Sequence, residues 1–207
     1  LVGSEMCIRD RYLVMLNLKE FESLKTECLS CTSCSLSETR QNVVFGRGNP
    51  FAKILIIGEG PGQIEDDRGL AFVGRSGKLL DELFLSVGIN VEKDCYISNI
   101  VKCRPPSNRK PRISEVENCS NWLQNQVSLI NPKIIILAGS TAVNSYLNIS
   151  KPITEIRGKW INKSNIKIMP IFHPAYLLRN PSNEINKPKW TTIQDLKKVK
   201  KELNLFV

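Results

Sequence analysis

Cysteines at short spacings are the first residues in this sequence that could do chemistry. Three of the seven, Cys28, Cys31 and Cys34, form two overlapping C-x-x-C pairs, and Cys103 and Cys119 follow with 15 residues between them. Seven cysteines in 207 residues are too few for a disulfide scaffold, and the N-terminal stretch has no pattern of a secretory signal. We therefore expect a reducing, cytoplasmic setting, in which clustered cysteines bind a metal more often than they form disulfides.

The single histidine stands in a second kind of segment, in which polar groups directly follow a short apolar run. His173 comes after such a run and is followed by Pro174. Three other segments share this arrangement, at residues 58–62, 98–106 and 139–141. In the first, G-E-G-P-G, glycines would let backbone N–H groups approach a ligand closely. No Lys-Ser/Thr follows it, as a phosphate-binding loop would require.

Apolar runs and amphipathic segments alternate along the chain and must position these groups. Buried strands are predicted at residues 53–58, 95–101, 133–139 and 166–172. Helices are predicted at residues 16–27, 76–87, 114–130 and 190–203, with a short one from residue 140. The helix at 114–130 would open with a capping box from Ser114 to Glu117. This alternation predicts a three-layer α/β fold, whose mostly parallel central sheet is flanked by helices and gathers the polar segments at the carboxyl ends of its strands.

Composition favours one globular domain with a polyanionic partner. Apolar residues make up 42% of the chain and charged residues 24%, which excludes wholesale disorder. Lys and Arg number 29 against 20 Asp and Glu, so the net charge is +9. Such an excess favours nucleic acid, since no apolar run is long enough for a membrane span and no long basic amphipathic helix is evident. We expect a monomer that does not bind membranes.

Residues 1–14 look foreign to the rest of the chain. The stretch L-V-G-S-E-M-C-I-R-D-R resembles translated adapter sequence at the edges of environmental gene fragments, so native sequence would begin near Met15. We expect residues 1–14 to be a non-native or disordered tail and residues 15–207 to form a single domain. Cys7 is left out of the chemistry on that ground.

Three motifs in this order carry a resemblance to a known family. They are G-E-G-P-G at residues 58–62 with E-D and F-V-G shortly after it, S-N-I-V-K-C-R-P-P-S-N-R at 98–109, and H-P-A-Y-L-L-R at 173–179. Together with the cysteine spacing they resemble the family 4 uracil-DNA glycosylases, which carry an iron–sulfur cluster. The resemblance implies a hydrolase of base excision repair, which flips deoxyuridine out of DNA, cleaves its N-glycosidic bond and leaves an abasic site.

The resemblance implies four cluster ligands, namely Cys31, Cys34, Cys103 and Cys119. The C-x-x-C pair of the family stands just before a Leu and an Arg, which favours Cys31 and Cys34 over Cys28. Four thiolates suit a [4Fe-4S] cluster, here with a structural role. Zinc is the alternative cofactor, although zinc ribbons repeat C-x-x-C in both halves and this chain does not. Cys28 is interpreted as a bystander near the cluster, and a role as an alternate ligand is the other interpretation.

The resemblance also implies residues that would recognise an extruded base. Phe72 matches the position that stacks on the base, and stacking does not tell one pyrimidine from another. Asn99 would discriminate, because its amide can accept from N3–H of uracil and donate to O4, whereas cytosine presents the opposite pattern. Glu65 matches a position thought to crowd the C5 side and exclude thymine. The alternatives are that Phe72 is a core residue, that the amide of Asn99 caps a strand end and that Glu65 is a solvated acid.

Catalysis would fall to the first and last of the polar segments. Cleavage gives an oxocarbenium-like sugar and a uracil anion, so charge stabilisation at the departing O2 should be the largest contribution. The resemblance assigns that donor to His173, and the alternative is a structural histidine at a strand end. Backbone N–H groups of Gly60, Gly62 and Gln63 are further candidate donors. Glu59 is the candidate for positioning the sugar or the water, and no residue is assigned as the general base.

DNA contacts are expected from the basic loop and from the segment after the histidine. The basic candidates are Lys102, Arg104, Arg109, Lys110 and Arg112. Each phosphate contact would steepen the salt dependence of binding. The candidates after the histidine are Tyr176, Leu177, Leu178 and Arg179. An apolar side chain there could wedge into the space that a flipped base leaves.

Two other functions stay open at this point. A non-enzymatic, metal-stabilised nucleic-acid-binding module would use the same loops only to grip phosphate, but it would not need Asn99 and His173 at strand ends. A glycosylase for another deaminated base is the second alternative, because the motifs do not specify the lesion. The expected partner is single- or double-stranded DNA that contains uracil.

Overall fold

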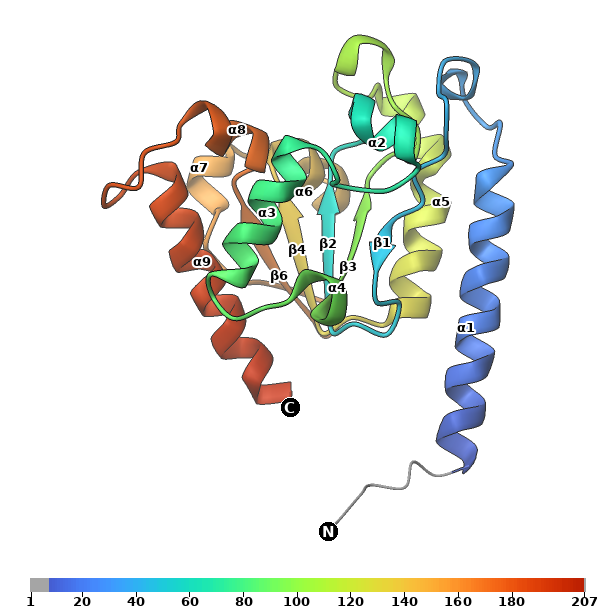
Figure 1. The fold of residues 1–207 in the computed structure, drawn as a ribbon, viewed down its shortest axis with the longest axis horizontal. Helices are drawn as coiled ribbons and strands as arrows, with labels where there is room; N and C mark the ends of the chain where they lie inside the picture. Colours follow the sequence, from blue (N-terminus) through green and yellow to red (C-terminus); the bar gives the residue numbers. More distant parts are fainter. Residues whose placement is uncertain (1–7, 207) are drawn as a thin grey trace.

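A six-stranded sheet forms the centre of this computed structural model, which describes the backbone of residues 8–206 and the side chains of residues 15–206 (Figure 1). The strand order is β1-β3-β2-β4-β6-β5. The strands are β1 (Arg47–Gly48), β2 (Ile54–Gly58), β3 (Cys95–Asn99), β4 (Ile134–Ala138), β5 (Ile161–Lys163) and β6 (Ile166–Ile171). The four inner strands run parallel, and β1 and β5 pair antiparallel at the two edges.

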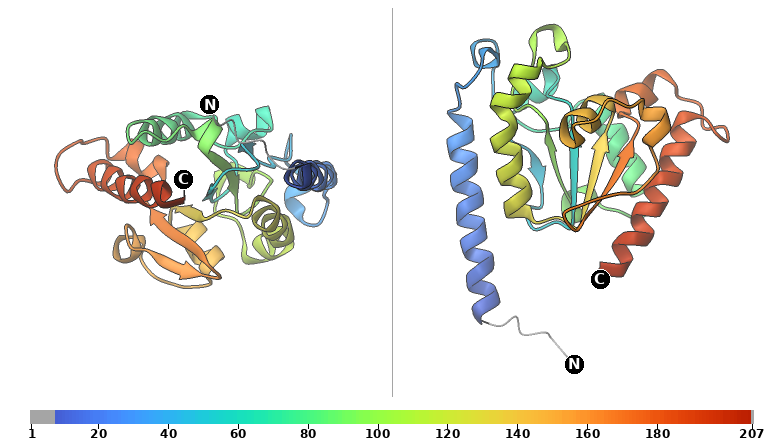
Figure 2. Two further views of the ribbon diagram at one scale, coloured as in Figure 1. Left: turned by 90° about the horizontal axis from the view of Figure 1, so that it is seen from below. Right: turned by 180° about the vertical axis from the view of Figure 1, so that it is seen from behind.

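Helices cover both faces of the sheet and complete the three layers (Figure 2). They are α1 (Ile8–Leu29), α2 (Gln63–Arg68), α3 (Arg75–Leu85), α4 (Val91–Asp94), α5 (Ile113–Ile130), α6 (Ser140–Leu147), α7 (Ile153–Ile156), α8 (Pro174–Arg179) and α9 (Pro188–Leu203). Helices α3 and α9 lie on one face, α5 and α6 lie on the other, and α1 packs beside α5. Turns of 3₁₀ helix span Ser35–Glu38, Pro106–Asn108 and Asn204–Phe206.

Each face of the sheet has its own apolar core, because successive residues of a strand point to opposite faces. Ile54 and Ile56 of β2 belong to the core that contains the apolar residues of α3 and α9. Leu55 and Ile57 belong to the core that contains those of α1, α5 and α6. Strands β2, β3 and β4 are buried along their whole length, as inner strands of a parallel sheet covered on both sides should be.

The predicted α/β class, its four parallel strands and its long helices are confirmed. The sequence does not predict β1 and β5, which are only two and three residues long. It also does not predict the short helices α2, α4, α7 and α8 as helices. Elements this short are fixed by their neighbours rather than by a periodic pattern of their own.

The start of α5 differs from the prediction, so the capping box at Ser114 and Glu117 is wrong. The cap lies two residues earlier, where Glu115 accepts the backbone N–H of Arg112 at 2.7 Å. The Glu115 carboxylate also pairs with Arg109, with nitrogen–oxygen distances of 2.6 and 2.8 Å. This ion pair with the preceding loop selects Glu115, and the local sequence pattern does not reveal it.

The first helix also begins earlier than predicted, at Ile8 instead of residue 16. Residues 8–14, which are predicted to be a tail, therefore lie within α1. Residues 1–7 and Cys7 lie outside the described residues, and the native start near Met15 stays a prediction. No helix within residues 8–206 combines the length and the apolar character needed to cross a membrane.

Candidate active site

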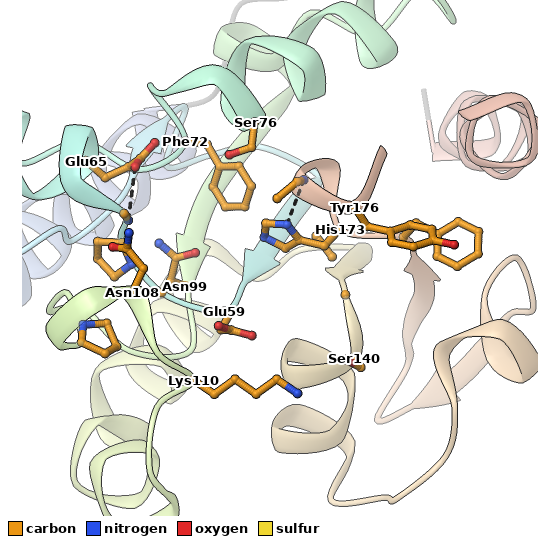
Figure 3. Close-up of a pocket in the computed structure, with 18 of the residues that line it drawn as sticks. Glu59, Glu65, Phe72, Ser76, Asn99, Asn108, Lys110, Ser140, His173 and Tyr176 are labelled. Atoms are coloured by element: carbon orange, nitrogen blue, oxygen red, sulfur yellow. Dashed lines mark hydrogen bonds between the residues drawn. The ribbon is translucent and has the colours of Figure 1, made fainter. Parts of the chain in front are cut away.

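A cavity of about 790 Å³ opens at the carboxyl ends of the parallel strands, and its size suits a nucleotide-sized ligand. Loops after β2, β3, β4 and β6 all contribute to it. Of the predicted site residues, those that line it are Glu59, Gly60, Gly62, Glu65, Phe72, Asn99 and His173. Figure 3 shows Phe72, Asn99 and His173 around one space, with Glu59 nearby. The fold therefore brings together groups that lie more than a hundred residues apart in sequence.

Alternation along β3 directs Asn99 to the face of the sheet that α3 covers. Asn99 has the same parity as Ile97, which belongs to the core under α3, so a shift of one residue in β3 would turn the amide to the opposite face. His173 lies two residues beyond the end of β6, where Ile171 and Phe172 both belong to that core and the alternation has ended. Its ring lines the cavity from the N-terminus of α8, which it caps.

Two glycines at strand ends make room for these side chains. A Cβ atom at Gly58 would lie 2.5 Å from Oδ1 of Asn99 and 2.5 Å from Cζ of Phe72. A Cβ atom at Gly139 would lie 2.8 Å from Cβ of His173, and Gly139 also has a φ of +93°. Glycine is thus required at both positions by the close approach of the site residues.

Phe72 forms one wall of the cavity in a strained backbone conformation. Its φ is +52°, in the left-handed region that aromatic residues rarely adopt. The residue is 5% exposed, and the centroid of its ring lies 5.9 Å from that of the His173 ring. Strained residues cluster at functional sites because their surroundings fix their position.

Asn99 presents an unsatisfied amide oxygen beside Phe72. The residue is 1% exposed, and Oδ1 has no hydrogen-bond partner among residues 15–206. A buried polar atom without a partner costs about 1–3 kcal/mol, so native proteins seldom contain one. Its backbone carbonyl is held by Nζ of Lys102 at 2.8 Å. The geometry fits a ligand that donates a hydrogen bond to this oxygen.

His173 caps the N-terminus of α8 and is a neutral donor. Its Nδ1 accepts the backbone N–H of Ala175 at 3.1 Å. A backbone amide can only donate, so Nδ1 carries no proton and the neutral ring carries its proton on Nε2. Burial lowers the pKa of His173 below the ordinary 6.5, although nearby Glu59 acts to raise it. The imidazole can therefore donate through Nε2 without being charged.

The two carboxylates of the cavity differ in how far they are engaged. Glu65 accepts the backbone N–H of Gly74 at 2.7 Å and that of Gly62 at 3.2 Å, and so ties two loops together. Glu59 is half-buried and lies close enough to His173 to affect its pKa. Gln63 is not part of the cavity lining, because its side chain bonds to Asp67 at 2.8 Å and to Arg104.

Two residues predicted to contact DNA lie inside the protein, and these predictions are wrong. Lys102 is 1% exposed, and its Nζ donates to Ser98 Oγ at 2.6 Å, Asn99 O at 2.8 Å and Gln126 Oε1 at 2.7 Å. Leu177 is also 1% exposed and packs in the core under α3. The sequence shows a basic loop and an apolar turn, but not which side chains point inward.

The other predicted DNA contacts divide between the cavity and the outer surface. Those that line the cavity are Arg109, Lys110, Tyr176 and Arg179. Those outside its lining are Arg104, Arg112 and Leu178. Tyr176 and Leu178 are each 37% exposed, so both remain available to a partner.

The cavity also contains polar residues that the sequence does not single out, namely Ser76, Asn108, Ser140 and Thr154. Ser140 belongs to the segment 139–141 after β4, whose position at a strand end is a usable signal. Thr154 lies in α7, which the pattern does not predict. Ser76 is reached only because the chain turns back at Phe72 to begin α3.

The cysteines meet on the opposite face of the sheet, around one small cavity. Five of them line it, namely Cys28, Cys31, Cys34, Cys103 and Cys119. All six cysteines among residues 15–206 are free thiols. Burial raises the pKa of Cys103 to about 11, and Arg40 acts to lower it. A cation would have to displace that proton on binding, as metals do at thiol ligands.

Three N–H groups point at the sulfurs of this cluster of cysteines. Trp122 Nε1 donates to Cys31 Sγ at 3.3 Å, and Arg40 Nη1 donates to Cys103 Sγ at 3.2 Å. The backbone N–H of Lys102 donates to Sγ of Cys119 at 3.3 Å. Such bonds suit sulfurs that carry negative charge.

The number and type of these donors suit a polynuclear group. Cys31, Cys34, Cys103 and Cys119 line the small cavity together with Cys28, and a four-iron cluster takes one thiolate for each iron. Within residues 15–206 the structure shows no group of three Cys, His, Asp or Glu side chains that could hold a metal ion. The fit to such a cluster therefore rests on the four thiols and on the N–H groups at their sulfurs.

Comparison with known proteins gives consistent matches over most of the chain. A family model described as "Uracil DNA glycosylase superfamily" matches residues 45–197. A "Type-4 uracil-DNA glycosylase" of Thermotoga maritima is 45% identical over 174 residues, which cover 82% of this chain and 88% of the relative. Relatives with the same description from Sulfurisphaera tokodaii and Archaeoglobus fulgidus are 40% and 38% identical, over 80% and 79% of this chain and 79% and 86% of their own lengths.

Proposed function

Since the chain belongs to the type-4 uracil-DNA glycosylases of the uracil DNA glycosylase superfamily, we propose that it removes uracil from DNA by hydrolysing the N-glycosidic bond. The product would be an abasic site, as in base excision repair. The observation that carries this proposal is the unpartnered Oδ1 of Asn99, buried beside Phe72 and facing the cavity of His173. A module that only grips phosphate has no need of a buried amide in this state.

Recognition of the base follows from Phe72 and Asn99. The Phe72 ring would stack on the flipped pyrimidine, which is worth about 1–3 kcal/mol. Oδ1 of Asn99 would accept from N3–H of uracil while Nδ2 donates to O4. Cytosine has an acceptor at N3 and an amino group at C4, so both contacts would be mismatched and buried. The fixed Glu65 carboxylate remains our candidate for the group that crowds C5 and excludes thymine.

Bond cleavage follows from His173 and Glu59. Nε2–H of His173 would donate to O2 of uracil as negative charge develops there, and the neutral ring does this without first losing a proton. Glu59 would orient the water that attacks C1′ and stabilise the cationic sugar beside it. The N–H of Gly62 is already bound to Glu65 and Gln63 does not line the cavity, which leaves Gly60 as the backbone donor that we retain.

DNA would approach the rim of the cavity. Arg109, Lys110 and Arg179 supply positive charge there, and Arg104 and Arg112 extend it outward along the loop. Tyr176 and Leu178 are the exposed side chains that could enter the space left by the base. We propose that the enzyme works on DNA as a monomer in the reducing cytoplasm, where clustered cysteines stay available to bind a metal.

A [4Fe-4S] cluster would be held by Cys31, Cys34, Cys103 and Cys119. Its role would be to fasten the segment after α1 to α5 and to the loop after β3. Protein purified without oxygen should show the visible absorption of an iron–sulfur cluster and about four irons per chain. Cys103→Ser should lower the soluble yield and the iron content together. A colourless protein loaded with zinc would contradict this cofactor.

The function is tested with oligonucleotides that differ at one base. Matched single- and double-stranded substrates carry uracil, thymine, cytosine or hypoxanthine, and abasic sites are revealed by alkaline cleavage. We expect strand breaks at uracil and none at thymine or cytosine. Binding of the uracil oligonucleotide with no abasic product would favour the phosphate-gripping module instead. Cleavage at hypoxanthine alone would assign a different lesion.

A further inference from the structure

Arg47 contacts Phe72 from outside the cavity. It lies in the edge strand β1 and lines a second groove, which shares Phe72 with the cavity. The side chain of Arg47 is 9% exposed. Since Arg47 does not line the cavity, no direct contact with the base is expected from it.

The guanidinium of Arg47 holds the two peptide groups that flank the α-carbon of Phe72. Nε donates to the carbonyl oxygen of Ala71 at 2.8 Å, and Nη2 donates to the carbonyl oxygen of Phe72 at 3.2 Å. The planes of these two peptides define φ and ψ of Phe72. One rigid fork of donors therefore fixes both backbone angles of a residue whose φ is +52°.

Other contacts fix the guanidinium in turn. Nη2 of Arg47 donates to both carboxylate oxygens of Asp81, at 2.6 and 2.9 Å, and Nη1 pairs with Glu92. Asp81 is on α3, the helix that begins directly after the Phe72 turn. On the other side, a Cβ atom at Gly77 would collide with the carbonyl of Phe72. The strained turn is thus clamped between Arg47 and the first turn of α3.

We propose that Arg47 is a positioning residue, which holds Phe72 in its left-handed conformation and so places the ring for stacking on the extruded base. The part of this inference that concerns the base rests on the proposed function. The part that concerns the Phe72 turn rests on the contacts alone. The two parts are tested separately.

The position of the ring is tested by ¹⁹F NMR on protein labelled with fluorophenylalanine. The chain has seven Phe residues, and Phe72→Leu identifies the resonance of Phe72. Arg47→Met should shift or broaden that resonance and leave the others in place. An unchanged Phe72 resonance in Arg47→Met overturns the proposal, whatever the activity of the protein.

The consequence for the base is tested by a double-mutant cycle with free uracil as the titrant. Arg47→Met should weaken uracil binding about tenfold, which corresponds to about 1.4 kcal/mol. In a Phe72→Ala background the same substitution should have no further effect, because its target is gone. Equal weakening in both backgrounds would mean that Arg47 acts on stability in general, and would overturn the proposal.

Controls separate failure of this inference from failure of the proposed function. Arg68→Met removes another arginine of the same groove and should leave uracil binding unchanged. Asp81→Asn loosens Arg47 from α3 and replaces Arg47→Met in both tests if that variant does not fold. Asp81→Asn should shift the Phe72 resonance and weaken uracil binding about threefold. If Asp81→Asn leaves both unchanged, the clamp is refuted. If the wild type neither binds nor releases uracil but Arg47→Met still shifts the Phe72 resonance, the proposed function fails and the role of Arg47 at the Phe72 turn stands.

Discussion

Ser98 and Asn99 are neighbours at the end of β3, yet they face two differently built regions. Ser98 points toward α5, where its Oγ contacts Phe45 O, Gln126 Oε1 and Lys102 Nζ within 3.1 Å. Asn99 points toward α3, where its Oδ1 contacts no donor in the part of the chain whose side chains are described. Both side chains are buried, so the difference is not one of exposure. The polar groups around Ser98 are paired within the protein, whereas the amide oxygen of Asn99 has no partner among residues 15–206.

The cysteines belong to the paired region. Lys102 joins them to it, because its backbone N–H donates to Cys119 and its ammonium group binds Ser98 and Gln126. All three ammonium hydrogens of Lys102 therefore have acceptors, counting the carbonyl of Asn99. The comparison indicates that the two faces of the sheet have different roles. Contacts on the α5 face hold the end of β3 in place, and the α3 face presents Asn99 to the cavity.

The largest effect should follow from changing His173, the hydrogen-bond donor in the cavity on the α3 face. His173→Ala should lower single-turnover excision of uracil by about 10²–10⁴-fold and leave affinity for abasic DNA nearly unchanged. His173→Asn is the matched variant, since an Asn side chain can still cap α8 at Ala175. It should restore thermal stability but not the rate. Wild-type activity in either variant would remove His173 from the reaction.

The next largest effect, on stability, should come from Lys102 and its partners on the α5 face. Lys102→Met removes a buried cation and takes one donor each from Ser98 Oγ, Gln126 Oε1 and the carbonyl of Asn99, so the free energy of unfolding should fall by roughly 3 kcal/mol. Chemical denaturation measures this. Lys110→Met is the control, because Lys110 is exposed in the same loop and should change stability by less than about 0.5 kcal/mol. Equal stability of both variants would show that the network does not hold the strand.

The sequence predicts the cavity on the α3 face better than the network of Ser98, Lys102 and Gln126 on the α5 face. Asn99 ends β3 and His173 follows β6, and both buried runs are plain in the sequence, so strand order brings these two residues together. Phe72 lies between α2 and α3, and only its sequence motif marks it. Lys102 belongs to the same basic run as Arg104, and charge alone suggests a surface role for both. Only the packing of α5 against β3 turns Lys102 inward, and that packing depends on residues far along the chain.

The same reason explains why Arg47 cannot be found from its surroundings in the sequence. It lies in a two-residue strand, and its partners Ala71, Asp81 and Glu92 are 24 or more residues away. The capping role of Glu115 cannot be predicted from the local sequence either, because its ion pair with Arg109 moves the cap of α5 away from the expected Ser114. Side chains that hold a site are chosen by tertiary contacts, whereas Asn99 and His173, which line the cavity, stand at or just after strand ends.

A smaller effect, on selectivity, should sharpen the role assigned to the unpaired amide. Asn99→Asp replaces a donor with a second acceptor, which suits the amino group of cytosine and repels O4 of uracil. The ratio of uracil to cytosine excision should fall by at least about tenfold, as for the loss of one bidentate base contact. Asn99→Ala should lower excision of uracil without any gain at cytosine. An unaltered ratio in Asn99→Asp would mean that another group reads the base.

The smallest expected effect is a pH dependence of stability that belongs to His173. Burial holds its pKa below 6.5 in the folded protein, so between the two values the unfolded chain binds a proton that the folded chain does not. Its contribution to stability is therefore fully present above the unfolded pKa and is lost as pH falls through 6.5 toward the folded pKa. The chain has one histidine, so His173→Asn should flatten the fall in unfolding free energy between about pH 7 and about pH 5. Parallel curves for the two proteins would mean that His173 titrates alike in both states, and the ring would then not be held neutral by its burial.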